Sequence, residues 1–169
     1  MDAKVPRRFQ LSARAWIILA FLAAACAAGY VALQVHWVYT VLVPDAYAQE
    51  WATFLVIQHM EQNDGAWPSS WDSLTKPYEA LTKEHGSFLA YAEIQDRVAI
   101  EFDADPEALR KMPLQPGRPP FKVIYLRSGA KHEWEGMEPN RMIWDYLNGL
   151  LRIENSDFRR DPLPQCLNS

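Results

Sequence analysis

The most pronounced pattern along the chain is an apolar segment without any charged residue between Arg14 and Asp45. A helix of about 20 apolar residues is long enough to cross the hydrocarbon core of a bilayer. Trp16 lies near the start of the segment, and Trp37 and Tyr39 lie near its end. Tryptophan and tyrosine favour the two membrane–water interfaces. The pattern therefore predicts one transmembrane helix at about residues 15–38, with an outer extension to residue 43.

After Pro44 the apolar positions first follow the period of a helix. No helix breaker occurs between Ala46 and Asn63, and most of the large apolar side chains in this segment share one broad side. The tripeptide Asn63-Asp64-Gly65 predicts the end of this helix, because asparagine and glycine readily adopt the left-handed conformation of a C-cap.

Four further helical segments are predicted. Ser70 is a typical N-cap for a short helical turn, and Pro77 is suited to the first turn of the next helix. Asp105-Pro106-Glu107 predicts a brief helical turn. Pro139 predicts the start of a last helix, with an apolar stripe formed by Met142, Ile143, Tyr146, Leu147, Leu150 and Leu151.

Three segments are predicted as strands: Leu89 to Ile94, Arg97 to Phe102 and Phe121 to Leu126. The second alternates apolar and polar residues, and Gln95-Asp96 predicts a hairpin between the first two. The proline-rich stretch between the second and third strands cannot sustain regular pairing. We therefore expect an α+β fold: a single N-terminal transmembrane helix, then a small domain of helices with an antiparallel sheet of about three strands.

This pattern divides the chain into four parts. Residues 1–14 form a basic tail, and residues 15–43 form the transmembrane helix and its outer extension. Residues 45–155 are long enough for one small α+β domain with its own core. Residues 156–169 are charged and contain proline, which predicts a flexible tail.

The charges around the apolar segment predict its orientation. Lys4, Arg7, Arg8 and Arg14 precede it against the single acid Asp2, and short basic flanks stay in the cytoplasm. Without these residues, 13 of the 17 basic and 20 of the 21 acidic residues remain. This excess of acidic residues makes nucleic acid an unfavourable partner, because phosphate groups are negatively charged as well. We expect a single-pass protein of the cell inner membrane, with a cytoplasmic N-terminus and an extracytoplasmic C-terminal domain.

Two alternatives to an uncleaved anchor remain open. A basic start, an apolar core and the small residues Ala23-Ala24-Ala25 also occur in cleaved signal peptides, and Cys26 stands where a lipoprotein would be acylated. Each alternative places the domain outside the cytoplasm. Cys26 in the membrane cannot pair with Cys166 near the end of the same chain, so no internal disulfide is expected.

Small residues recur at four-residue spacing in the apolar segment. Ala20, Ala24 and Ala28, with Gly29 beside them, predict a face on which another helix can approach closely. The lipid bilayer is thus one expected partner, and a protein in the membrane or envelope is another.

Motifs for catalysis or cofactor binding do not occur. The four histidines lack an i, i+4 pair, and there is no G-x-S-x-G or phosphate-binding glycine loop. We therefore predict no catalytic residue, cofactor or metal site. A membrane-tethered enzyme that uses scattered carboxylates or His132 remains the alternative to a binding protein.

The turn after the first outer helix carries a resemblance. Asp64, Gly65, Trp67 and Pro68, followed by Trp71, resemble the Gly-aromatic-Pro turn that ends the long helix of bacterial type II secretion pseudopilins and related pilin-like proteins. The resemblance covers about residues 15 to 102. It implies a helical stem in the membrane, a head with a sheet outside, and a binding or scaffold role in an envelope or secretion-type complex. The apolar segment has no prepilin peptidase site.

Overall fold

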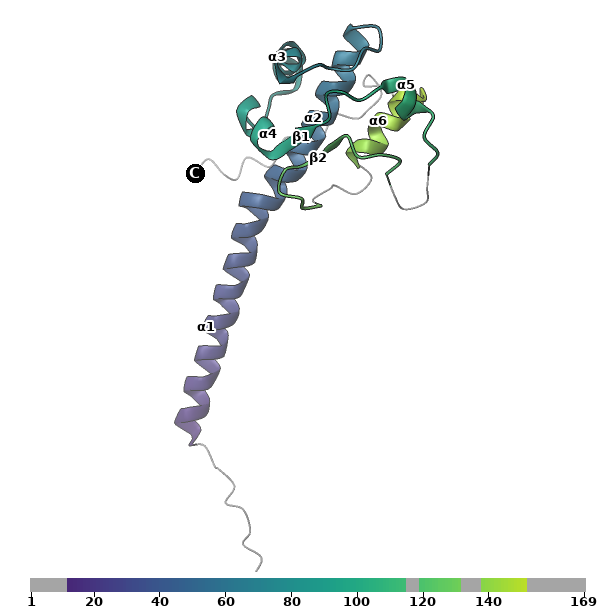
Figure 1. Cartoon of the computed structure of the whole chain (residues 1–169). Helices are drawn as coiled ribbons and strands as arrows, with labels where there is room; N and C mark the ends of the chain where they lie inside the picture. The colour runs from purple at the N-terminus through teal and green to yellow at the C-terminus, as the bar shows by residue number, and fades with distance from the viewer. Residues whose placement is uncertain (1–11, 115–118, 132–137, 152–169) are drawn as a thin grey trace, which may run out of the picture. The chain divides into compact units, whose positions relative to one another are not determined.

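The computed structural model describes residues 12–114, 119–131 and 138–151, and the chain forms two compact units, Met1–Val41 and Leu42–Ser169 (Figure 1). Most of the predicted basic tail, His132, the predicted flexible tail and Cys166 lie outside the described residues.

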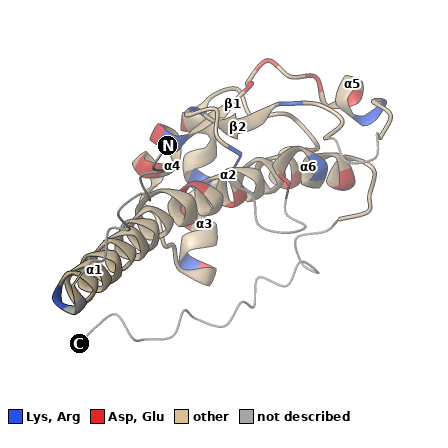
Figure 2. Ribbon diagram, turned by 90° about the horizontal axis from the view of Figure 1, so that it is seen from below, with Lys and Arg blue, Asp and Glu red and all other residues tan. Residues whose placement is uncertain are grey.

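The first unit contains helix α1 (Ala13–Trp37). Ser12 caps its start, where the Ser12 Oγ accepts a hydrogen bond from the backbone N–H of Ala15 at 3.3 Å. Figure 2 shows that α1 carries no Lys, Arg, Asp or Glu beyond its first turn. The predicted long apolar helix is present, and it is long and apolar enough to cross a membrane. A π-helical turn, η1 (Val38–Leu42), follows in the chain.

The second unit is built around helix α2 (Val43–Gln62). Its apolar side chains supply much of the buried core, and Leu55, Ile57 and Met60 are completely buried. Figure 1 shows α3 and α4 on one side of α2 and α5 and α6 on the other. The bounds of α2 confirm the predicted helix Ala46–Asn63. The helix begins earlier than expected, with Pro44 in its first turn.

The later helices also follow the predicted pattern. A 3₁₀ turn, η2 (Trp71–Leu74), leads directly into α3 (Thr75–His85), which has Pro77 in its first turn. The turn at Pro106 opens the short helix α5 (Pro106–Arg110), and Pro139 opens α6 (Pro139–Leu147). Because α6 ends at Leu147, Leu150 lies outside the helix and is exposed, contrary to the predicted apolar stripe.

Two strands form an antiparallel sheet. Strand β1 (Val98–Ile100) pairs with β2 (Ile124–Leu126), and Ala99 lies opposite Tyr125 in the register. Within the residues described here the sheet has two strands, so a third strand is not seen.

The predicted strand from Leu89 to Ile94 is wrong. Helix α4 (Tyr91–Arg97) occupies most of this segment and includes the residues assigned to a hairpin turn. The Glu93 carboxylate accepts the backbone N–H of Ala90 at 2.9 Å, which is a capping interaction that favours a helix start. Ile94 is completely buried, and α4 packs against α2. Tertiary burial therefore determined this element.

A partly buried ion pair joins the end of α4 to the start of α2. The Asp45 side chain is 7% exposed, and its Oδ1 lies 2.5 Å from Nη1 of Arg97. Arg97 also accepts a hydrogen bond through its carbonyl from the backbone N–H of Arg127, at 2.8 Å. This contact extends the strand pairing one residue beyond the pair of Val98 and Leu126.

Candidate functional site

Three segments of the second unit line an open groove with a volume of about 920 Å³. The first is the end of α2 with the turn after it, the second is α5, and the third is the end of α6 with the residues after it. We call this the acidic groove, because its described lining residues include three acids, Glu61, Asp64 and Glu107, and one basic residue, Arg110. Its volume lies at the upper end of the range typical of ligand sites.

The end of α2 shapes one wall of the groove. Asp64 has a φ of 53° and Gly65 a φ of 83°, and the backbone N–H of Gly65 donates to the carbonyl of Met60 at 2.8 Å. This is the pairing of a Schellman motif, in which a left-handed residue ends the helix. The predicted turn is confirmed, and it leaves Asp64 and Gly65 exposed at the groove.

Trp67 forms the aromatic part of this wall. Its ring is half-buried against the core, and its Nε1–H donates to the carbonyl of Glu101 at 2.8 Å. Part of the ring is exposed in the groove. Pro68, next in the chain, is buried. The turn motif thus supplies both a core contact and a piece of accessible aromatic surface.

The end of α6 forms the opposite wall. Gly149 has a φ of 71°, and the backbone N–H of Leu150 donates to the carbonyl of Asp145 at 2.8 Å, so this helix also ends in a Schellman motif. Tyr146 and Leu147 are half-buried and line the groove. Burial raises the pKa of the Tyr146 phenol above 10.0, and the carboxylate of Glu61 raises it further.

Helix α5 closes the third side. Asp105 caps it, with its Oδ1 accepting the backbone N–H of Glu107 at 3.0 Å. The side chains of Glu107 and Arg110 are exposed. Among the residues that the structure describes, no hydrogen bond or ion pair involves the carboxylate of Asp64 or of Glu107. The groove therefore presents carboxylates beside aromatic and aliphatic side chains.

Trp71 has a structural position outside the groove. Its ring makes edge contacts with Tyr91 and Phe102, at centroid distances of 6.0 and 5.9 Å. Tyr91 also stacks near Tyr78, at 4.9 Å, and donates its hydroxyl hydrogen to the Trp71 carbonyl. The indole Nε1 of Trp71 is buried and has no hydrogen-bond partner within the described parts of the chain.

The remaining residues singled out in the sequence lie in α1 and η1. Trp16, Trp37 and Tyr39 are 62%, 42% and 65% exposed. The side chains of Ala20, Ala24 and Ala28 are exposed as well, and a Cβ placed on Gly29 would meet nothing within 4 Å. These positions are open to lipid or to another helix.

Sequence reasoning missed Glu107, Arg110, Tyr146 and Leu147 as parts of one site. Local signals were present, since the Asp105-Pro106 helix start and the apolar stripe of α6 were both recognised. Their convergence depends on how α6 packs against α2 and how α5 packs against α6, and no short-range pattern reports that packing.

The histidines of the described chain show no metal-binding geometry. His59 lies with its Nδ1 3.2 Å from the Ser73 carbonyl, a contact that ties α2 to η2. Over residues 12–114, 119–131 and 138–151, no three His, Cys, Asp or Glu side chains are grouped so as to hold a metal ion. No protein-family model, curated protein or solved structure matches this chain.

Proposed function

We propose that this chain is a membrane-anchored subunit whose second unit lies outside the cytoplasm and binds another protein of an envelope complex. The observation that carries the proposal is α1. Its 25 residues hold no charged side chain after Arg14, and large apolar groups are exposed along it, including Phe21 at 74% and Leu33 at 68%. A bilayer would remove this surface from water.

The orientation rests on charge. The four basic residues before the apolar segment favour a cytoplasmic N-terminus. The rest of the chain has more acidic than basic residues and would then lie on the outer side of the membrane. Both its charge and this location argue against nucleic acid as a partner.

A pseudopilin-like architecture is part of the proposal. Its support is the order of elements: an exposed apolar helix, a core helix directly after it in the chain, a Gly-aromatic-Pro turn, and then a small antiparallel sheet. The proposal does not include filament assembly, because the apolar segment lacks the glycine and glutamate of a prepilin peptidase site.

Binding is favoured over catalysis by the character of the acidic groove. The groove is open and places the half-buried rings of Trp67 and Tyr146 among exposed carboxylates. Partly exposed aromatic surface with a polar rim is typical of sites where another molecule is recognised.

The anchor and its orientation are tested with alkaline phosphatase fusions in a bacterial host. Phosphatase fused after Ser169 should be active, because the enzyme folds only outside the cytoplasm, and phosphatase fused after Ser12 should be inactive. The protein should stay in the membrane fraction after a carbonate wash. An inactive Ser169 fusion, or release by carbonate, would contradict the proposal.

The control for this experiment alters only the anchor. Replacing Leu22 with arginine places a charge within α1, at a cost of about 2.5–3.5 kcal/mol for insertion at the bilayer centre. This variant should lower the membrane-bound fraction, whereas Leu22→Val should leave it unchanged.

A further inference from the structure

We infer that the acidic groove is a binding site for a short basic peptide segment, one that places an arginine or lysine next to an aromatic side chain and belongs to another protein. This inference rests on the proposed binding function and names the chemistry of the partner. The groove lies entirely within the second unit, so the inference concerns that unit alone.

Charge complementarity favours a cationic ligand. Among the residues that the structure describes, three carboxylates and one guanidinium, that of Arg110, line the groove, and the carboxylates of Asp64 and Glu107 are exposed. Two helices, α2 and α6, also end at the groove, and the C-terminal end of a helix dipole favours a positive charge. The opposite dipole of the short α5 is offset by Asp105 at its N-cap and by Glu107 in its first turn.

The apolar walls favour an aromatic or aliphatic side chain beside that charge. The ring of Trp67 is held in place by its hydrogen bond to the Glu101 carbonyl, so little side-chain entropy is lost when a ligand packs against it. Tyr146, Leu147 and Leu151 supply further apolar surface on the facing wall. Tryptophan and tyrosine rings also attract arginine and lysine directly by cation–π contact.

The openness of the groove favours a peptide segment as its occupant. A volume of about 920 Å³ exceeds what a single side chain fills, and the site is not enclosed. Successive side chains of an extended peptide point in opposite directions, so a charged residue and the aromatic residue next to it can contact different walls of a groove of this kind.

The test uses the full-length protein in non-ionic detergent and a fluorescein-labelled peptide with the core arginine–phenylalanine–arginine. Fluorescence anisotropy should show saturable binding that weakens as the salt concentration rises. A peptide with glutamate–phenylalanine–glutamate should not bind, and one with arginine–alanine–arginine should bind several-fold more weakly. Equal binding of the phenylalanine and alanine peptides would overturn the inference.

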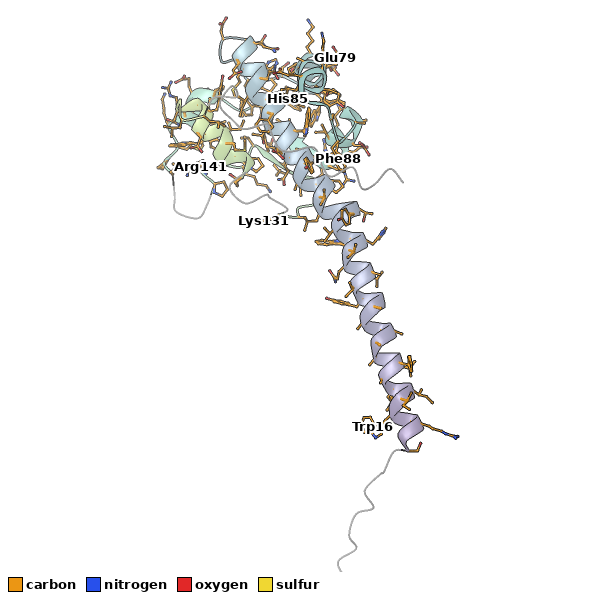
Figure 3. All side chains as sticks on the ribbon, turned by 180° about the vertical axis from the view of Figure 1, so that it is seen from behind. Trp16, Glu79, His85, Phe88, Lys131 and Arg141 are labelled. Atoms are coloured by element: carbon orange, nitrogen blue, oxygen red, sulfur yellow. The ribbon has the colours of Figure 1, made fainter. Side chains whose placement is uncertain are left out.

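A matched pair of variants locates the binding. Asp64→Asn with Glu107→Gln removes two charges from the groove, and asparagine tolerates the positive φ at residue 64. Glu79→Gln with Glu84→Gln removes two exposed charges from α3, which does not line the groove (Figure 3). The groove variant should weaken binding about fivefold, the loss expected from two exposed ion pairs, and the α3 variant should leave it unchanged.

Three other results would overturn the inference. They are the absence of saturable binding, an equal loss in both double variants, and a gain of tenfold or more when residues 152–169 are deleted. The last result would identify the chain's own C-terminal segment, which follows Leu151 at the groove wall, as the occupant. None of these results changes the phosphatase and carbonate measurements, so failure of the groove and failure of the membrane proposal are distinguishable.

Discussion

At the scale of single residues, Trp67 combines two roles: one requires part of its ring to be buried, and the other requires part of its ring to be exposed. Its hydrogen bond to Glu101 and its core contact stabilise the fold, and its exposed part lines the groove. Trp67→Phe removes the hydrogen bond and should lower the free energy of unfolding by about 1 kcal/mol. Trp67→Ala also removes the packing and should cost about 2–3 kcal/mol, less than a fully buried tryptophan.

Urea unfolding followed by circular dichroism measures both Trp67 effects. Trp144→Phe is the matched control, because the Trp144 Nε1–H also donates to a distant carbonyl, that of Met112, at 2.9 Å. The two phenylalanine variants should lose similar stability, and only the Trp67 variants should weaken peptide binding. An unfolding free energy unchanged by Trp67→Ala would show that its core contact contributes nothing.

Tyr146 gives a prediction about pH. Burial and then Glu61 raise the pKa of its phenol above 10.0, so the folded state holds this proton more tightly than the unfolded state does. The stabilising contribution is therefore complete below pH 10 and is lost as the pH rises through the folded-state pKa. The pKa values of Tyr91 and Tyr125 are also raised, so Tyr146 is isolated as the part of the phenolate absorbance that Tyr146→Phe removes, and this part should titrate late.

The cause of the Tyr146 shift is tested with Glu61→Gln. This variant removes the smaller of the two causes, so the late phenol should titrate at a somewhat lower pH while staying above its ordinary value. A late titration lost completely in Glu61→Gln would show that charge, and not burial, dominates the shift.

At the scale of elements, the two helix ends at the groove depend on left-handed backbone. Gly149 has a φ of 71°, and a Cβ at this position would meet nothing within 4 Å, so conformation alone restricts the residue. Gly149→Ala should therefore lower the free energy of unfolding by about 1 kcal/mol. Gly149→Asn should lose less, since asparagine tolerates this region, and a larger loss for asparagine in thermal melts would argue against a backbone cause.

Asn140 connects two other elements, α6 and β2. Its side chain is buried, and its Oδ1 accepts the backbone N–H groups of Val123 and Ile124 at 2.7 and 2.9 Å. Its Nδ2 donates to the Ile124 carbonyl at 3.0 Å and to Oε1 of Glu138 at 2.8 Å. The amide thus completes the edge of β2 in the way that a third strand would.

Truncation of Asn140 should be among the more damaging polar substitutions. Asn140→Ala leaves buried backbone groups of β2 without partners and should lower the free energy of unfolding by about 2–4 kcal/mol. Asn148→Ala, at the C-cap of the same helix, removes one side-chain hydrogen bond, to the Trp144 carbonyl, and should cost less than about 1 kcal/mol. Chemical unfolding of both variants makes the comparison, and equal losses would contradict the bridging role of Asn140.

At the scale of the whole molecule, α1 lies in the first unit, which presents a surface of its own to the membrane and to other helices. Ala24→Leu with Ala28→Leu replaces two small side chains of the predicted contact face with larger ones. This change should keep another helix from approaching closely and should weaken self-association in a membrane two-hybrid assay. Ala23→Leu with Ala27→Leu makes the same chemical change on a neighbouring face and should leave the signal unchanged. The same signal from both variants would remove this face as a contact.

The sequence by itself determined the elements whose signals are local. The apolar run of α1, the helix α2, the turn at Asn63-Asp64-Gly65 and the proline-opened helices α5 and α6 were all predicted. Each depends on residues within a few positions of one another: an apolar period, a cap, or a residue that tolerates positive φ. The strands β1 and β2 were found for the same reason, though each is shorter than predicted.

Only the tertiary structure decided the identity of α4 and the existence of the acidic groove. The segment before β1 is short enough to satisfy either period, and it became a helix because Ile94 and Tyr91 pack against other elements in that form. The groove brings together residues near positions 64, 107 and 147. Contacts across such separations depend on the packing of whole helices around α2, and packing free energy is a property of the assembled core rather than of any local sequence pattern.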